Sequence, residues 1–138
     1  MGTILTPYLN FRDTAREAME FYQSALGGEL TSSTFAEFGV SDDAAEKDKI
    51  MHSQLRTDGG LVIMAADVPN SMEYTSGSNF SVSLSGDDNA ELTGFYNKLS
   101  EGGTVIEPLS QAPWGDSFGM FVDRFGVNWL VNIAGASE

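Results

Sequence analysis

The alternation of hydrophobic and polar positions along the chain predicts a protein built largely from short β-strands. The clearest case is residues 117–132, SFGMFVDRFGVNWLVN. Phe118, Met120 and Val122 alternate with other residue types, residues 123–126 bring in a glycine, and a run rich in β-branched and aromatic side chains follows. Two such runs around a glycine-containing turn predict a β-hairpin.

Two segments change to a helical period, because their apolar residues recur three and four positions apart. The first segment contains Ala15, Ala18, Met19, Tyr22 and Leu26, and the second contains Leu92, Phe95, Tyr96 and Leu99. Asp13 or Thr14 can cap the first helix. Asp88, with Glu91 three residues later, resembles a capping box for the second.

The remaining apolar or alternating runs predict the other strands, at residues 4–11, 29–38, 50–56, 61–67, 79–85 and 104–106. Pro7 removes a backbone donor from the first of these strands, so we expect that strand at a sheet edge. Residues 39–49 are interpreted as a loop or a short helical turn. Residues 108–114 are interpreted as a connection into the hairpin.

The order of predicted elements occurs twice. Each half has a strand, a helix with a Phe-Tyr pair, a Gly-Gly stop, a strand and a hairpin. We therefore predict a βαβββ unit at residues 1–67, a linker at 68–78 and a second unit at 79–138. The expected fold is α+β. Its two cupped mixed sheets enclose a cavity and carry the helices on their outer face.

Composition narrows the function classes. The chain has 138 residues, with 20 acidic and 7 basic side chains and a net charge of −13. Such a chain lacks the clustered cations that bind nucleic acid or anionic membranes. A cationic ligand is compatible with this charge, but an ordinary acidic surface explains it equally simply. The chain has no cysteine, no membrane-spanning run and no signal segment, so we expect a cytoplasmic protein.

Ordered motifs run through nearly the whole chain, at residues 7–11 (PYLNF), 18–22, 27–30, 49–55 (KIMHSQL), 99–105, 108–109, 114–115, 118–120 and 123–129 (DRFGVNW). With the repeated βαβββ unit, they resemble the vicinal oxygen chelate superfamily of glyoxalases, dioxygenases and bleomycin-resistance proteins. The chain looks most like its PhnB-like branch. The resemblance implies a homodimer and a small-molecule site between the units.

Metal-dependent members of that superfamily carry His or Glu at four inward positions, on the first and last strand of each unit. Carried over by motif, these positions fall near Thr6, Met64, Ser81 and Leu130. Hydroxyl, thioether and alkyl groups hold divalent ions poorly. We therefore expect no metal, and the sequence has no glycine-rich loop that would indicate another cofactor.

Six residues are candidates for contact with a ligand: Tyr8, Asn10, His52, Met64, Ser81 and Trp114. His52 is the single histidine, and no acid or base stands beside it in the sequence to complete a catalytic pair. It fits a general base or a ligand contact, but a hydrogen-bonded structural role is favoured for a lone histidine. Trp114 fits either a stacking lid or a core plug. Trp129 is expected in the core or a dimer interface.

Two further acidic residues, Asp67 and Asp123, are interpreted as turn residues that bond the local backbone.

The sequence favours a metal-free protein that binds a small organic molecule. The alternative is a glyoxalase- or dioxygenase-type enzyme with a non-standard site. A third possibility, a regulatory partner in phosphonate metabolism, rests only on the name of the PhnB branch.

Overall fold

The computed structural model describes residues 2–39, 44–75, 77 and 79–135. The chain divides into two compact units, residues 1–75 and 76–138, which we call unit 1 and unit 2. Each unit has its own sheet and its own buried residues, so each is described by itself.

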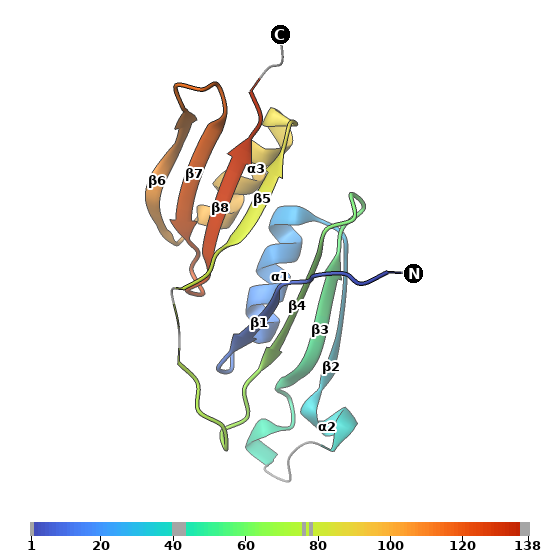
Figure 1. Ribbon diagram of the computed structural model, residues 1–138. Helices are drawn as coiled ribbons and strands as arrows, with labels where there is room; N and C mark the ends of the chain where they lie inside the picture. The colour runs from blue at the N-terminus through green and yellow to red at the C-terminus, as the bar shows by residue number, and fades with distance from the viewer. Residues whose placement is uncertain (1, 40–43, 76, 78, 136–138) are drawn as a thin grey trace. The chain divides into compact units, whose positions relative to one another are not determined.

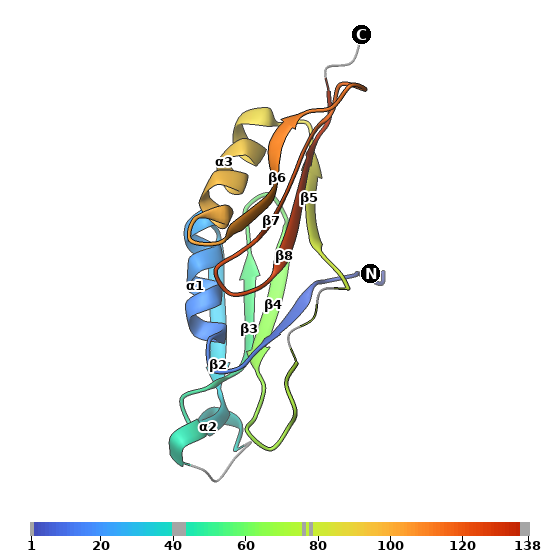
Figure 2. The ribbon, with the colours of Figure 1, turned by 90° about the vertical axis from the view of Figure 1, so that its left-hand side faces the viewer.

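Unit 1 contains a four-stranded mixed sheet in the order β1-β4-β3-β2. Its elements are β1 (Tyr8–Phe11), α1 (Ala15–Leu26), β2 (Glu29–Thr34), α2 (Phe35–Phe38), a 3-10 turn at Ala44–Glu46, β3 (Ile50–Arg56) and β4 (Val62–Asp67). Strand β1 runs parallel to β4, and the other pairs are antiparallel. Helix α1 lies against one face of the sheet (Figures 1 and 2).

Unit 2 repeats this topology, with the order β5-β8-β7-β6. Its elements are β5 (Val82–Gly86), α3 (Asn89–Ser100), β6 (Thr104–Gln111), β7 (Ser117–Val122) and β8 (Asn128–Ile133). Strand β5 is again parallel to the last strand of its unit. The predicted α+β fold with two βαβββ units is therefore confirmed.

The helical stripes are buried as their spacing predicts, except for Phe95, which is half-buried. In α1 the buried residues are Ala15, Ala18, Met19, Tyr22, Ala25 and Leu26, and in α3 they are Leu92, Tyr96 and Leu99. The Asp88 side chain accepts a hydrogen bond from the Glu91 amide at 3.0 Å, which confirms the predicted cap of α3. In the described part of the chain, no helix is both long and apolar enough to cross a membrane.

The start of α1 differs from the prediction. Thr14 occupies the cap position, but its side chain makes no capping hydrogen bond within the described residues. The buried Asp67 carboxylate takes that role: it accepts from the amide of Ala15 at 3.0 Å and from that of Ile50 at 2.9 Å. Asp67 is thus a long-range tie between α1, β3 and β4, so the prediction of a local turn residue is wrong.

The turns of the two hairpins share one hydrogen-bond pattern. In unit 1 the Thr57 amide donates to the Leu61 carbonyl, and the Leu61 amide donates to the Thr57 hydroxyl. In unit 2 Asp123 and Val127 exchange the same two bonds, with the Asp123 carboxylate in place of the hydroxyl. The second Asp123 oxygen accepts from the Trp129 indole at 2.8 Å, and Trp129 is fully buried in the core.

The Gly-Gly pairs also have matching roles. Gly27 and Gly102 adopt φ angles of 78° and 79°, which glycine tolerates best. At the second glycine of each pair, a larger residue is excluded because there is no space for its side chain. A β-carbon on Gly28 would overlap the carbonyl oxygen of Arg56, and one on Gly103 would overlap that of Val122. The chain after each helix therefore passes directly against the end of the neighbouring strand.

Three predicted strands have different limits in the structure. The first strand begins at Tyr8 instead of residue 4 and lies at a sheet edge, as expected from Pro7. The second strand ends at Thr34, because Thr34 and Glu37 form a reciprocal capping box that starts α2. Strand β5 begins at Val82, so Ser81 precedes it.

The predicted connection at residues 108–114 is partly wrong. Strand β6 continues through Pro108 to Gln111. It can do so because β6 is an edge strand, where a missing amide donor is tolerated, and its pairing with β7 shifts register twice.

Replacing Gly103 by alanine should lower the free energy of unfolding by about 2 kcal/mol or more, because the methyl group has no space beside the Val122 carbonyl. Urea denaturation would measure this change. The control is Gly94→Ala, since a β-carbon on Gly94 in α3 meets nothing within 4 Å. That variant should gain about 0.5–1 kcal/mol. Equal stability of Gly103→Ala and the parent protein would contradict the close approach.

Candidate functional site

One face of the unit 1 sheet lies opposite α1, and we call it the helix-free face of unit 1. Cross-strand pairing joins Tyr8 to Met64, Met64 to Gln54 and Gln54 to Thr31 in one row. Side chains two residues along a strand share its face. The face therefore includes seven neighbouring side chains: Tyr8, Asn10, Thr31, Ser33, His52, Gln54 and Met64. The same pairing and spacing add Glu29, Arg56, Val62 and Ala66 at its margins. Their neighbours on the other side, including Leu9, Leu55 and Ala65, are buried.

Tyr8 and His52 meet on this face. The Tyr8 hydroxyl oxygen lies 3.4 Å from His52 Nδ1, which is longer than an ordinary hydrogen bond. The two ring centroids are 5.9 Å apart. Burial raises the pKa of the Tyr8 phenol above its ordinary value of 10.0, so the hydroxyl keeps its proton at neutral pH. The sequence placed both residues among the candidates but gave His52 no partner, because 44 residues separate the two.

The other candidates are divided between the units. Met64 and Asn10 share the helix-free face with His52, and Asn10 is exposed. Ser81 and Trp114 belong to unit 2, where Ser81 is exposed ahead of β5. Trp114 is 76% exposed in the loop between β6 and β7, which rules out a core plug.

The corresponding face of unit 2 has different chemistry. The matching hairpin turns align β3 with β7, so that His52, Gln54 and Arg56 correspond to Phe118, Met120 and Val122. The polar side chains of β3 thus have apolar counterparts in β7. On the neighbouring strand β8, Asn132 pairs with Phe118 and Asn128 pairs with Val122, so this face of unit 2 keeps polar groups beside the apolar ones.

A small pocket extends the helix-free face of unit 1. It has a volume of about 190 Å³ and is lined by Glu29, Thr31, Gln54, Arg56, Thr57 and Asp58. Thr31 and Gln54 belong to both the pocket and the face. Unit 2 has a larger open pocket of about 640 Å³. Its polar lining is partly engaged within the protein, since the Gln111 amide donates to the Gly115 carbonyl at 3.1 Å. We therefore give more weight to the unit 1 face.

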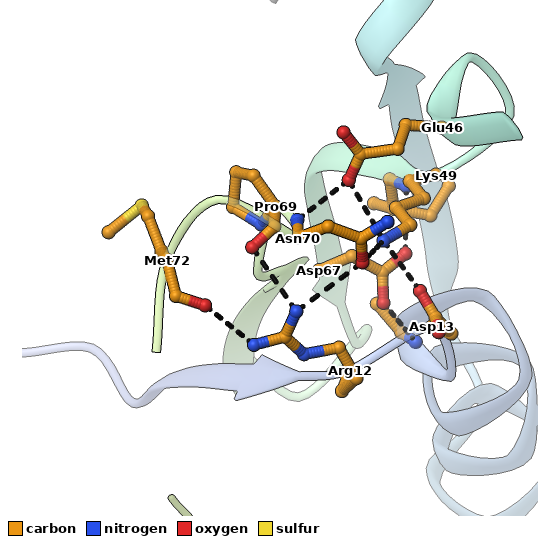
Figure 3. A network of polar contacts seen from close by, with 10 residues as sticks. Arg12, Asp13, Glu46, Lys49, Asp67, Pro69, Asn70 and Met72 are labelled. Atoms are coloured by element: carbon orange, nitrogen blue, oxygen red, sulfur yellow. Dashed lines mark hydrogen bonds and ion pairs between the residues drawn. The ribbon is translucent and has the colours of Figure 1, made fainter. Parts of the chain in front are cut away.

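A second group of charged residues in unit 1 has Lys49 at its centre (Figure 3). The Lys49 ammonium lies 2.7 Å from the Asp13 carboxylate and 3.0 Å from the Glu46 carboxylate. It also donates to the Asn70 side chain at 2.9 Å. The Lys49 and Glu46 side chains are nearly buried, at 10% and 6% exposure. Every charge in this group has a protein partner, so the group has a structural role.

Arg12 fastens the chain that follows β4 (Figure 3). Its guanidinium donates to the carbonyls of Met72 at 2.6 Å and Pro69 at 3.3 Å. It also lies 5.9 Å from the centre of the Tyr74 ring, in cation–π geometry. Together with the contacts of Asn70, these bonds hold residues 69–74 against unit 1.

Comparison with known proteins identifies the family. A sequence profile of the glyoxalase/bleomycin resistance protein/dioxygenase superfamily matches residues 5–131. The chain belongs to this superfamily. The resemblance expected from its motifs is therefore confirmed.

Individual relatives agree with this superfamily assignment. Protein YjdN of Escherichia coli (strain K12) is 29% identical over 140 residues, covering 94% of each chain. The crystal structure of protein PA1353 from Pseudomonas aeruginosa has a TM-score of 0.80 and 41% identity, covering 96% of this chain and 98% of that one. A putative 3-demethylubiquinone-9 3-methyltransferase, PhnB protein, from Bacillus cereus has a TM-score of 0.71 at 24% identity, covering 96% and 100%. This last similarity concerns the fold alone.

The positions at which the resemblance led us to expect metal ligands have other side chains in this chain. In unit 1 the residue that faces Met64 across the sheet is Tyr8, two residues after the expected ligand position Thr6. In unit 2 the residue that faces Leu130 is Ser83, two residues after the expected position Ser81. Tyr8 and Ser83, in place of Thr6 and Ser81, add neither an imidazole nor a carboxylate to these positions. Among the described residues, no three His, Cys, Asp or Glu side chains are grouped to hold an ion. The side chains at these positions do not fit a divalent metal.

Replacing Lys49 by methionine should lower the free energy of unfolding by about 2 kcal/mol, because the nearly buried Glu46 carboxylate loses its countercharge. Denaturation in urea at pH 7 would test this. The matched control is Lys47→Met on the same connection, where the side chain is exposed and the change should stay within about 0.5 kcal/mol. A Lys49 variant as stable as the control would show that the ion pairs contribute nothing.

The stabilisation by Lys49 should also depend on pH. Burial acts to lower the pKa of Lys49, but hydrogen bonds and opposite charges from Asp13 and Glu46 outweigh it and raise the pKa above 10.5. The contribution is therefore complete below about pH 10.5 and is lost as pH rises through the higher folded-state value. The stability difference between the parent and Lys49→Met should shrink in that alkaline range.

Proposed function

We propose that this superfamily member binds a small organic molecule on the helix-free face of unit 1 without a divalent metal. The observation that carries the proposal is the set of side chains at the two cross-strand pairs, Tyr8 with Met64 and Ser83 with Leu130. These pairs lack metal-binding groups. The helix-free face of unit 1 offers polar side chains for hydrogen bonds, and Met64 adds apolar surface beside them. Convergent polar groups on a partly apolar surface are typical of small-molecule sites.

A second candidate function is catalysis at this face. The Tyr8–His52 pair supports it, because a histidine held by a hydrogen bond can act as a general base near neutral pH. The protein would then be a glyoxalase- or dioxygenase-type enzyme with a non-standard site. The superfamily name covers enzymes and resistance proteins alike, so it supports both candidates. Binding without turnover is the simpler proposal, since it needs only the contacts described.

The remaining features of the proposal follow from charge and family. We propose a cytoplasmic homodimer whose single functional domain combines residues 1–67 and 79–138 through the linker 68–78. The net charge of −13 supports a partner other than nucleic acid or an anionic membrane. We propose Trp114 and Ser81 as further ligand contacts, in unit 2.

A thermal-shift screen tests binding and metal dependence together. Small organic molecules should stabilise the protein, by about 2.7 kcal/mol at 100 times the dissociation constant, while Mn²⁺, Zn²⁺ and Ni²⁺ alone should not. His52→Ala should weaken binding of any hit at least tenfold. The control Met72→Ala changes an exposed side chain in the segment after β4, outside the sheet, and should leave affinity unchanged. Stabilisation by a stoichiometric metal, or hits indifferent to His52, would refute the proposal.

A further inference from the structure

The Tyr8–His52 contact has a consequence for the free side of the histidine ring. The two ring nitrogens of a neutral histidine differ: one carries a proton and the other accepts. A phenol is a better donor than acceptor, and the raised pKa keeps the proton on Tyr8. The contact itself is compatible with either tautomer, but a phenol that donates to Nδ1 leaves the ring proton on Nε2. Among the described residues, Nε2 has no hydrogen-bond partner.

We propose that Tyr8 fixes His52 as an Nε2–H donor, and that the helix-free face of unit 1 thereby recognises a small molecule through a carboxylate group. This inference rests on the proposed function and adds the chemical class of the ligand. The carboxylate is the commonest organic group that offers several acceptor sites to neighbouring N–H donors.

The neighbours of His52 extend the row of donors. Gln54 is two residues further along β3 and points the same way, at a spacing of about 7 Å. Its amide and the amide of Asn10 can each donate two hydrogen bonds. Beyond Gln54, Arg56 lines the adjoining pocket and brings a permanent positive charge. A ligand that lies along β3 would meet His52, Gln54 and Arg56 in that order.

The acidic residues do not oppose this arrangement at its centre. The face carries one carboxylate, Glu29, which pairs with Arg56 and lies four residues along β2 from Ser33, the partner of His52. Glu29 and Asp58 line the far part of the pocket, next to Arg56. The net charge of −13 repels anions at long range, but salt screens that repulsion beyond about 8 Å at physiological ionic strength. A carboxylate at Nε2 is therefore governed by the donors nearest to it. A cationic ligand would find no countercharge there.

Two probes of one shape and opposite charge, benzoate and benzylamine, test the inference. The chain has one histidine, so the ring signals of His52 in a proton–carbon NMR spectrum need no assignment. Titration at about 0.15 M ionic strength should move these signals with benzoate, at a dissociation constant at least tenfold lower than for benzylamine.

Three variants connect this preference to the residues. His52→Gln keeps an N–H donor near the position of Nε2 and should retain benzoate binding within about threefold, while His52→Leu should lose it at least tenfold. For these variants binding is followed through the Tyr8 ring signals. Tyr8→Phe frees Nδ1 and should weaken the preference for benzoate. Circular dichroism of each variant checks that it is folded.

The outcomes separate this inference from the proposed function. If benzylamine binds and benzoate does not, or if His52→Leu binds benzoate as well as His52→Gln does, the carboxylate inference is wrong and the site remains. If neither probe moves the His52 or Tyr8 signals while a hit from the thermal-shift screen does, the inference is also wrong. If no small molecule moves those signals, the proposed function itself fails.

Discussion

The Asp67 carboxylate accepts hydrogen bonds from two backbone amides, that of Ala15 at the start of α1 and that of Ile50 at the start of β3. Asp67 ends β4, so one buried side chain ties three elements together, and each such bond to a charged group contributes about 1.5–3 kcal/mol. Tyr8 and His52 depend on this tie. Strand β1 pairs with β4 and leads into α1, and His52 follows Ile50 by two residues. A slip of one residue in β3 would turn His52 to the opposite face.

The two units share the same backbone constraints but differ in the side chains on their sheets. Gly28 and Gly103 make the same close approach to a strand end, and both hairpin turns close with the same hydrogen bonds. These constraints are steric and local to the backbone, so they leave the outward side chains free to differ. In β3 those side chains are polar and include His52, whereas the matching position of β7 is Phe118. At these positions β3 thus supplies hydrogen-bonding groups, and β7 supplies apolar surface.

The sequence predicted the features that depend on neighbouring residues, such as strand limits and helix ends. Strand β3 has the predicted bounds although its alternation is weak, and the Gly-Gly stops were placed correctly because few other residues fit there. The misses involve distant partners. The Asp67 bonds cross 52 and 17 residues, and the Tyr8–His52 contact crosses 44, distances at which sequence spacing carries no signal. Pro108 suggested the end of a strand, and only the sheet order reveals that β6 is an edge that tolerates it.

The central claim is that Tyr8 and His52 form a hydrogen-bonded pair that presents a donor on the helix-free face of unit 1. Long-range proton–nitrogen NMR of the ring measures this most directly, since the chain has a single histidine. The account predicts a protonated Nε2, and an unprotonated Nδ1 whose nitrogen shift changes when Tyr8 is replaced by phenylalanine. A proton on Nδ1, or an Nδ1 shift that Tyr8→Phe leaves unaltered, would contradict it.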